Sequence, residues 1–547
     1  MKKIYIKFLC ALCLLCVLCA SCNDINNLTP EGSGLTAEQV VEATEQVPSR
    51  AEAEFSGMFT MMGKPDYTLS DDRADDFGFI MMGISDDTEG PDMVYPNSGY
   101  NWFSVCGELT SRYVNYANPR IRYSMPYNQI QVANSIISKF ADKDDDTSKN
   151  HVAQARALRA YDYMYLAPHF QFGYAAGAQD KPCVPLVTEE TTEFGNNPRA
   201  TVAEVYAQIL QDLNAALEVL TIERTDKSRI NRTVVLGLLA RVYLTQQEWA
   251  KAADYADQAI QAAQAEGLRI ATIDEVSKPA FCDINEPNWI WGYDINTGLS
   301  NQEYATCASW LGSFSSYGYA AGAGCYASIN HLLWNKISNT DIRKQWWVDY
   351  NLHSDLLTGQ TWGSATGDAI SLLEIDDVKF AFTPMTNVKF GIPSGIGTEA
   401  NDADYPFMRV EEMYLIKAEG LAKSGNTGEA QNVLKEFALN RDPSYSVPAT
   451  RTLENEIWYQ RRVELWGEGF AWSDLMRLNK PLVRFHADDL GNEYPEAFRF
   501  NMEAGDGWML MRFPLSEMNT NMGIVDNTEG YQPVQDQNPD LRDGVTD

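Results

Sequence analysis

Apolar residues at helical spacing, behind a helix-start signal, constrain the fold of this chain most strongly. Thr201 and Glu204 have the spacing of a capping box, in which both side chains satisfy free amides at a helix N-terminus. The residues after the box predict one apolar stripe along a helix: Val202, Val205, Tyr206, Ile209, Leu213, Ala216, Leu217 and Leu220. The same periodicity predicts helices at 152–166, around 236–244, and from Trp249 to a stop at Gly267.

A helix-turn-helix pattern recurs later in the chain. Two further apolar runs flank a turn at Gly425. Ala240 and Ala252 are twelve residues apart, and so are Ala418 and Ala430. Small residues at such points let paired helices approach closely. The pattern resembles tetratricopeptide repeats, in which neighbouring helix pairs bury each other's apolar faces.

Helical periodicity fades between residues 271 and 404, where Gly, Ser, Asn and aromatic residues become frequent. Loops carried on a rigid helical frame are a common place for binding groups. The predicted fold class is therefore mainly α, with tetratricopeptide-like helical repeats and an irregular, loop- and short-strand-rich ligand-binding region at 271–404. Helical regions are expected on both sides of it, at 51–270 and 405–547.

The start of the chain has the pattern of a bacterial lipoprotein leader. Three lysines among the first seven residues precede an apolar run at 8–20, which is too short to span a bilayer. Small residues then precede Cys22, while Cys19 stands where leucine is typical. We expect a signal peptide at 1–21, acylation of Cys22, and a polar tether at 22–50. Ordinary secretion with cleavage nearby is the alternative.

Composition indicates a globular body rather than a nucleic-acid-binding protein. Hydrophobic residues make up 45% of the chain and charged residues 22%. The net charge of −32 leaves no basic surface to meet phosphates, and it favours solubility at a cell surface. Beyond the leader, no stretch approaches the ~20 apolar residues of a membrane-spanning helix.

Cysteine usage does not predict a disulfide framework or a zinc site. Five cysteines belong to the leader, and five remain in the body: Cys106, Cys183, Cys282, Cys307 and Cys325. Their number is odd and no two form a CxxC pair, so buried free thiols are expected. A disulfide between Cys307 and Cys325 stays open.

Motifs for catalysis are missing from the sequence. The five histidines are scattered, and there is no HExxH, GxSxG or P-loop, so we predict no catalytic residue, no metal site and no cofactor. The acidic cluster at 71–76 lacks the spacing of a calcium loop, and solvation is its default interpretation. The charged residues at 461–474 are interpreted as structural ion pairs rather than a catalytic carboxylate pair.

Two aromatic clusters are the candidate binding residues. The first lies in a Pro-, Gly-, Ser- and Asn-rich setting and comprises Tyr95, Tyr100, Asn101, Trp102 and Phe103. The second lies in a glycine- and serine-rich stretch without helical spacing and comprises Trp310, Phe314, Tyr317 and Tyr319. Aromatic rings stack on the flat CH faces of sugars, and amides bind their hydroxyls, whereas a peptide would use a similar cleft with more backbone pairing. Other aromatics are assigned to strand packing (Trp289, Trp291, Tyr293) or left undecided (Trp346, Trp347, Trp362).

Several blocks, in order along the chain, resemble the SusD/RagB family of outer-membrane nutrient-binding lipoproteins. The blocks lie at 75–79, 92–93, 99–102, 134–137, 157–161, 198–201, 205–206, 212–213, 341–344, 461–475, 513–517 and 537–539. The most specific is RRVELWGEGFAWSDL at 461–475. Ala471 departs from the family pattern, which usually has a basic residue beside the tryptophan, and this weakens an internal ion pair that the family would form.

The resemblance implies a single, mainly helical body with four tetratricopeptide-like units. It implies a lipoprotein at the outer membrane that captures oligosaccharides, or peptides in some members, and passes them to a SusC-like TonB-dependent transporter. The two aromatic clusters would then meet at one ligand site. A secreted glycoside hydrolase and a tetratricopeptide scaffold that binds only protein are the alternatives; 75 acidic residues leave room for a glycosidase carboxylate pair.

Overall fold

The computed structural model describes residues 49–64, 68–69, 75–96, 103–295, 311–313, 326–358, 361–362, 365–366, 383–395, 401–487, 494–527, 529–535 and 537–547. Residues 57–547 form one unit, described here by itself, and the segment before Gly57 belongs to another. In the described residues, no helix combines the length and the apolar character needed to cross a membrane.

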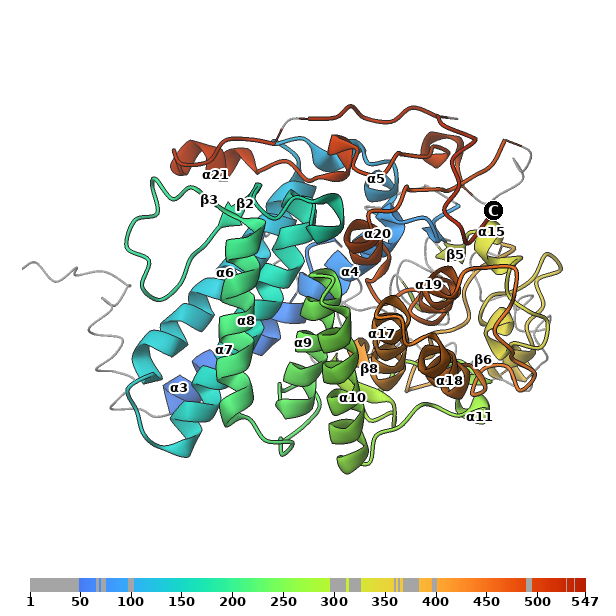
Figure 1. The fold of residues 1–547 in the computed structure, drawn as a ribbon, viewed down its shortest axis with the longest axis horizontal. Helices are drawn as coiled ribbons and strands as arrows, with labels where there is room; N and C mark the ends of the chain where they lie inside the picture. The colour runs from blue at the N-terminus through green and yellow to red at the C-terminus, as the bar shows by residue number, and fades with distance from the viewer. Residues whose placement is uncertain are drawn as a thin grey trace, which may run out of the picture. The chain divides into compact units, whose positions relative to one another are not determined.

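Long helices packed side by side form the frame of this unit (Figure 1). They are α6 (Ala117–Phe140), α7 (Asp146–Phe170), α8 (Val202–Val219), α9 (Arg232–Thr245), α10 (Trp249–Ala265), α17 (Val410–Lys423) and α18 (Thr427–Ala438). Each of these helices packs against the next one in this order. The contact between α10 and α17 joins two helices that are far apart in the sequence. The predicted mainly helical, tetratricopeptide-like fold is confirmed.

Local sequence explains where several of these helices begin and end. The capping box predicted at Thr201 and Glu204 is present at the start of α8. Asp145 accepts a hydrogen bond from the Ser148 amide and caps α7, so the acidic turn before it has a structural role. Gly267, which follows α10, has a φ of +80°, a left-handed conformation that glycine adopts without strain.

Small residues set the distance between α10 and α17. A Cβ atom on Gly420 would lie 2.6 Å from the carbonyl oxygen of Trp249 and 2.9 Å from the amide nitrogen of Ala253, both of them backbone atoms that cannot swing aside. The four alanines singled out by their twelve-residue spacing are all fully buried: Ala240, Ala252, Ala418 and Ala430. Close helix pairing at these positions is therefore confirmed.

The region between α10 and α17 is built from short elements. Its main sheet is β4 (Trp289–Tyr293) paired antiparallel with β8 (Tyr405–Arg409). Trp289, Trp291 and Tyr293 are buried, which confirms their assignment to strand packing. Trp346 and Trp347, left undecided above, also belong to the core, while the side chain of Trp362 lies outside the described residues.

Segments from both ends of the chain complete the unit. The N-terminal ones are α4 (Gly78–Glu89), β1 (Met93–Val94) and α5 (Ser104–Gly107), and the C-terminal ones are α19 (Leu453–Glu464), α20 (Ala471–Leu478) and α21 (Leu515–Thr520), while α3 (Ser49–Thr60) crosses the boundary at Gly57. The remaining elements are η3 (Met61–Gly63), η4 (Thr110–Arg112), η5 (Tyr174–Ala176), β2 (Pro182–Pro185), β3 (Arg199–Thr201), α11 (Ile273–Val276), β5 (Ser328–Ile329), α15 (His331–Trp334), η6 (Ile342–Trp346), η7 (Asp355–Leu357), β6 (Thr361–Trp362), β7 (Ala365–Thr366), η8 (Glu496–Phe498) and η9 (Gly507–Met509).

The structure tests the expectations for the cysteines of the body and for the acidic cluster at 71–76. Cys106, Cys183 and Cys282 are buried free thiols, as expected, while Cys307 and Cys325 lie outside the described residues. Solvation was the wrong default for Asp75 and Asp76, because both are buried. Asp76 accepts hydrogen bonds from the backbone amides of Thr68 and Leu69 and so fixes a turn, while burial raises the pKa of its carboxyl. Asp71 and Asp72 are outside the described residues.

Candidate ligand-binding site

The predicted binding residues fall in two segments whose flanks are well defined. Tyr100, Asn101, Trp102, Trp310, Phe314, Tyr317 and Tyr319 themselves lie outside the described residues, as does Cys22. The described chain ends at Tyr95 and Pro96 before the first cluster and resumes at Phe103. In the second cluster, Leu311 to Ser313 separate Trp310 from Phe314, Tyr317 and Tyr319, and the described chain resumes at Tyr326. Apart from Pro96, these flanking residues are buried.

A two-stranded ribbon brings the two segments to one place. β1 and β5 pair antiparallel, with Met93 opposite Ile329 and Val94 opposite Ser328. The chain leaves β1 toward the first cluster and enters β5 from the second. In an antiparallel pair these two connections lie at the same end of the ribbon. The end of β1, which leads to the first cluster, and the start of β5, which follows the second cluster, are thus adjacent in the fold.

Stacked aromatic rings close the base of the first segment. The rings of Tyr95 and Phe103 are 6.1 Å apart between centroids, with an interplanar angle of 20°. Both side chains are fully buried, so these two predicted members of the cluster pack in the core and do not face a ligand. They hold the two ends of residues 97–102 together, which is a supporting role that the sequence did not indicate.

The side chain of Asn387 closes the base of the second segment. Its Nδ2 donates to the carbonyl oxygens of Leu311 at 2.9 Å and Ala327 at 3.1 Å, on either side of residues 314–325. The hydroxyl of Ser313 in turn donates to the Asn387 carbonyl at 2.5 Å. The side chains of Asn387 and Ser313 are buried, where hydrogen bonds are costly to break. Residues 314–325 therefore begin and end beside one fixed amide.

Arg484 binds the core on both sides of the first segment. Its guanidinium is fully buried and donates to five backbone carbonyls, those of Thr88, Glu89, Gly90, Gly107 and Phe498, at 2.6–3.3 Å. Gly90 precedes β1 and Gly107 ends α5, so the Arg484 side chain forms hydrogen bonds to the backbone both before and after residues 97–102. Burial lowers the pKa of this guanidinium below its usual value.

A buried salt bridge connects the ribbon to the 461–475 block. Arg462 donates to both carboxylate oxygens of Asp92, at 2.8 and 2.7 Å, and also to Asp543 at 2.6 Å. The carbonyl of Asp92 accepts hydrogen bonds from the Trp466 indole and the Asn330 amide. Asp92 directly precedes β1, so the charged block positions the start of the ribbon.

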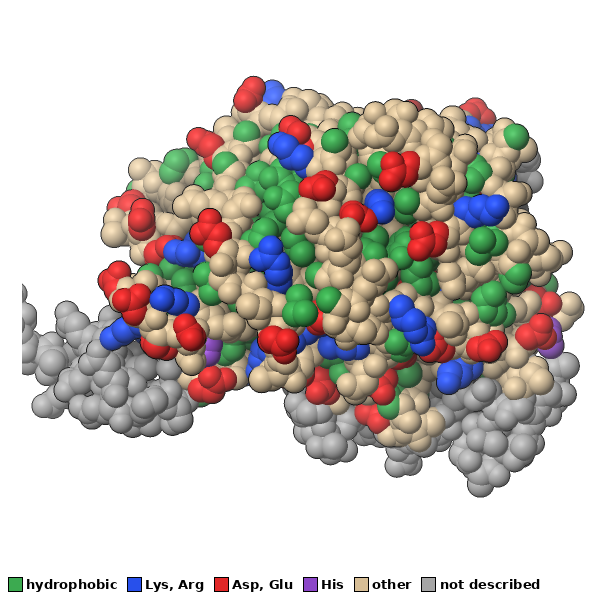
Figure 2. Space-filling view, turned by 60° about the horizontal axis from the view of Figure 1, so that its bottom comes forward, with side chains coloured by type: hydrophobic (Ala, Val, Ile, Leu, Met, Phe, Trp, Pro, Cys, Tyr) green, Lys and Arg blue, Asp and Glu red, His purple; other side chains and the backbone are tan. Residues whose placement is uncertain are grey.

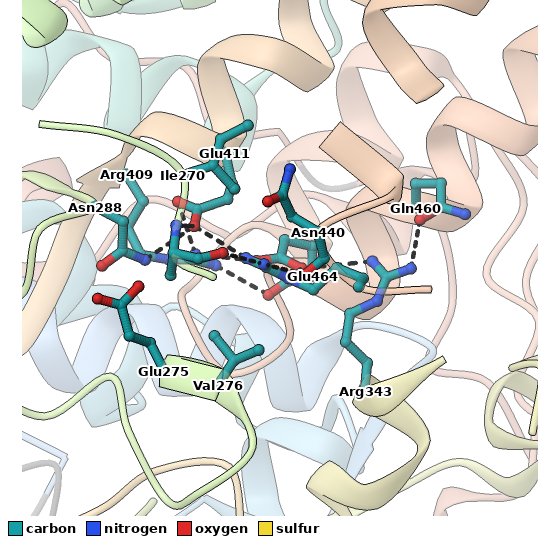
Figure 3. A network of polar contacts seen from close by, with 12 residues as sticks. Ile270, Glu275, Val276, Asn288, Arg343, Arg409, Glu411, Asn440, Gln460 and Glu464 are labelled. Atoms are coloured by element: carbon teal, nitrogen blue, oxygen red, sulfur yellow. Dashed lines mark hydrogen bonds and ion pairs between the residues drawn. The ribbon is translucent and has the colours of Figure 1, made fainter. Parts of the chain in front are cut away.

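The rest of the charged block forms a closed network centred on Glu464 (Figure 3). Arg409 and Arg441 lie 3.0 and 2.9 Å from one of its carboxylate oxygens, and Arg343 is 3.4 Å from the other. All four side chains have no solvent exposure. Burial alone would favour the neutral acid, but Arg441 and Arg409 hold the pKa of Glu464 well below its usual range.

This network confirms the interpretation of residues 461–474 as structural ion pairs. Glu468 is neutralised by Lys389 and Arg409, and Asp474 by Arg461 and Arg477, all of them buried. Each of these carboxylates is therefore neutralised by cationic partners of the protein itself. Among the described residues, no group of three His, Cys, Asp or Glu side chains is placed to hold a metal ion.

The departure at position 471 has a local explanation. The Ala471 amide donates to Asp87, and its methyl group lies where a Cβ on Gly90 would approach within 2.6 Å. The glycine at position 90 therefore leaves room for the Ala471 side chain. Arg112 instead supplies a cation 4.5 Å above the ring of the neighbouring Trp472.

Comparison with known proteins identifies the family. A family model described as "Starch-binding associating with outer membrane" matches residues 83–244, and the model of the SusD family matches residues 336–545. Together the two matches include the helices α7 to α9, the β1–β5 ribbon's first strand and the whole 461–475 block. The chain belongs to the SusD/RagB family.

Individual relatives are distant in sequence but share most of their length with this chain. The SusD-like protein P2 of Formosa agariphila is 25% identical over 436 residues, which are 74% of this chain and 79% of that protein. A SusD-like protein of Bacteroides ovatus is 23% identical over 64% of both chains.

Solved structures show the same fold. The SusD-like carbohydrate binding protein from Bacteroides vulgatus has a TM-score of 0.68 and 24% identity, and the match covers 87% of this chain and 97% of that one. A laminarin binding SusD-like protein has a TM-score of 0.63 and 21% identity, covering 88% and 99%.

Proposed function

We propose that this protein is an outer-membrane lipoprotein that captures oligosaccharides at the cell surface and delivers them to a TonB-dependent transporter. The observation that carries the proposal is the β1–β5 ribbon, since the first aromatic-rich segment follows β1 and the second precedes β5 at the same end of this two-stranded unit. Trp102 and Trp310 are the proposed platforms for sugar rings. Asn101 is the proposed hydroxyl partner, with Tyr100, Phe314, Tyr317 and Tyr319 completing the site.

The anchoring of the two segments suits a binding site. A loop that is held at its base loses less conformational entropy when it closes on a ligand, and this favours affinity. Tyr95 and Phe103 hold one base, and Asn387 holds the other. Because these residues are buried, the described chain beside both segments is fixed to the core.

Sugar is the favoured ligand class because of the residue types in both clusters and because of the relatives. Tryptophan and tyrosine stack on the CH faces of sugars, and the relatives include a carbohydrate binding and a laminarin binding protein. On the face shown in Figure 2, acidic and basic side chains are interspersed, which does not favour a polyanionic ligand such as nucleic acid.

The proposal includes membrane attachment through Cys22. One family model matched by this chain describes association with the outer membrane. An acylated Cys22, followed by the polar segment 22–50, would tether the helical unit beside its transporter. We expect a Cys22→Ser variant to move from the membrane fraction to the soluble fraction. Retention of that variant in the membranes would contradict the lipid anchor without touching the ligand site.

The proposal excludes turnover of the bound sugar. The charged block that offered a candidate carboxylate pair is buried and neutralised, so it cannot protonate a glycosidic oxygen. We therefore expect incubation with polysaccharides to release no new reducing ends. Their release by the purified protein would support a glycoside hydrolase instead.

The decisive experiment is a glycan and peptide array screen, followed by calorimetric titration with the best ligand. Replacing both Trp102 and Trp310 with alanine should weaken binding by about 100-fold or more, since two stacking platforms are lost. Tyr531→Ala is the matched control, because Tyr531 is 91% exposed and distant in sequence from both clusters. Unchanged affinity in the double variant would reject this site, and binding of peptides alone would reject the sugar class.

A further inference from the structure

A cavity lies among the helices, apart from the β1–β5 ribbon. It has a volume of about 140 Å³ and is lined by residues of α4, α7, α9, α17 and α20 together with β8. Its lining, within the described residues, includes no member of β1 or β5. It is smaller than the roughly 300–1,000 Å³ of pockets for drug-sized ligands, so a single ring is the appropriate size of occupant.

A row of contacting aromatic rings forms one wall of this cavity. Phe79 lies 5.4 Å from Tyr165 and 4.8 Å from Tyr161, measured between ring centroids. Tyr161 lies 6.3 Å from Phe407, which is 5.7 Å from Tyr405. Tyr161 and Tyr165 are half-buried, so part of this wall faces open space rather than core. Such a surface suits the flat apolar face of a ligand.

Phe470 adds another ring, and cations hold it in place. The guanidinium of Arg241 lies 5.0 Å from its centroid and that of Arg461 lies 5.8 Å away. Phe470 is half-buried and lines the cavity, as does Ser473 on the first turn of α20. The cavity therefore has aromatic surface contributed by segments far apart in the sequence.

The charged side chains of the lining are already paired. Arg241 makes a two-bond contact with Glu412, at 2.7 and 2.6 Å. Asp474 accepts from Arg461 at 2.8 Å and from Arg477 at 2.7 Å. A charged ligand would have to compete with these internal partners. A neutral ligand would instead add hydrogen bonds to polar atoms that are fixed in position.

One donor of the lining has bonding capacity left. Arg461 uses Nε and Nη2 for Asp474, while its Nη1, which is buried, has no acceptor among the described residues. A hydroxyl group is an acceptor that such a nitrogen can use without any added charge. Aromatic walls combined with neutralised polar groups are the features that recognise a ring with apolar faces and a hydroxyl-bearing edge.

We propose that the cavity between α4, α7, α9, α17 and α20 is a second binding site, which takes one neutral sugar ring. The aromatic row from Tyr165 to Tyr405 would contact a CH face, and Arg461 with its neighbours would bind hydroxyls. Its described lining includes neither strand of the ribbon nor Tyr95, Phe103 or Asn387, so binding here can be tested separately from binding by the two aromatic segments.

The test is saturation-transfer NMR on the full chain with single sugars: glucose, galactose, mannose, xylose, fucose and N-acetylglucosamine. At least one should receive magnetisation from the protein. Ser473→Trp, which fills the cavity, and Phe470→Ala, which removes a ring, should each reduce that signal about fivefold or more. The matched control Ser516→Trp places the same ring on the exposed face of α21 and should leave the signal unchanged.

The outcomes separate this site from the proposed oligosaccharide site. The signal should persist when Trp102 and Trp310 are both replaced with alanine; its loss there would assign the single sugar to the aromatic segments and overturn the second site. Absence of transfer to every sugar would also overturn it. Binding of indole that is lost in Ser473→Trp, without binding of any sugar, would show an apolar pocket and overturn the sugar class. Circular dichroism of each variant confirms folding, and Met164→Trp is a second filling variant if Ser473→Trp fails to fold.

Discussion

At the scale of single residues, buried polar side chains fix the base of the proposed oligosaccharide site. Arg484 joins five carbonyls across the first segment, Asn387 joins the two ends of the second, and Asp92 joins the ribbon to Arg462. None of these side chains is placed to contact a ligand directly. Their contribution is to fix the described chain on either side of the proposed binding segments, at the cost of burying polar groups that need hydrogen-bond partners.

Replacing Arg484 with lysine should destabilise the protein although the charge is kept. Lysine lacks the planar fork of arginine, so at least two of the five carbonyls would be left without this donor. We expect a loss of about 2–4 kcal/mol in the free energy of unfolding, measured with urea. The control Arg269→Lys, at a half-exposed pair with Glu275, should cost below about 1 kcal/mol. Equal effects of the two variants would contradict the carbonyl clamp.

Asp87 should make stability fall as pH rises. Burial raises the pKa of its carboxyl from 3.8 to about 7, although the amides of Ala471 and Gly469 favour the charged form. Because the unfolded chain loses its proton first, folding is penalised progressively between about pH 4 and pH 7, and the penalty is constant above that range.

Asp87→Asn removes this titration, so the stability of the variant relative to the parent should increase from pH 4 to pH 7 and then level off. Urea unfolding at several pH values measures the difference, in which titrations shared by both proteins cancel. A difference that stays constant over this range would show that the folded pKa of Asp87 is close to its ordinary value.

The sequence predicted the burial of several side chains, but it did not predict which residues form hydrogen bonds with one another. The buried roles of Trp289 and Trp291 were predicted because strand-forming aromatics in a row have a local signature. Asn387 and Arg484 were missed because their hydrogen bonds join segments far apart in the chain, and no local pattern marks such a residue. Tyr95 and Phe103 were assigned to the ligand-binding cluster, since composition alone cannot separate the base of a loop from its tip.

At the scale of elements, the long helices follow from the sequence and the short strands do not. Apolar periodicity and a capping box predicted α8, α9 and α10, and the alanine spacing predicted the later pair α17 and α18. The two-residue strands β1 and β5 have no periodicity to detect, and their pairing joins distant segments. The β1–β5 ribbon, on which the proposed oligosaccharide site depends, was therefore not predicted from the sequence.

Gly420→Ala should disturb the packing of α17 on α10. The added methyl would meet the Trp249 carbonyl at 2.6 Å, and backbone atoms cannot move aside without shifting a helix. We expect a loss of about 1–3 kcal/mol in unfolding free energy. Gly428→Ala in α18 is the matched control: nothing lies within 4 Å of the new Cβ, so helix propensity should stabilise the variant by up to about 1 kcal/mol. Stabilisation by both changes would show that the two helices are less closely packed.

At the scale of the whole molecule, main-chain pairing and buried ion pairs connect the regions that composition distinguishes. β4 from the loop-rich region pairs with β8 at the start of the C-terminal helices. The C-terminal tail returns to the N-terminal helices, where the Met511 amide donates to the His169 carbonyl and Arg112 donates to Met509. We therefore propose the boundaries at 270 and 404 as changes in architecture within one cooperative unit, not as limits of independently folding domains.

This connectivity predicts a single unfolding transition for residues 57–547, which calorimetry measures. Asp543, close to the C-terminus, is the sharpest probe, because it is buried and pairs with Arg462, which also holds Asp92 at the ribbon. Asp543→Asn should lower the whole transition by about 1–3 kcal/mol, since Arg462 keeps only one of its two carboxylate partners. If the regions were independent, the change would instead split the transition and leave α6 to α10 melting at the parental temperature. Hydrogen exchange in those helices distinguishes the two outcomes, because a cooperative unit loses protection everywhere when one distant ion pair is weakened.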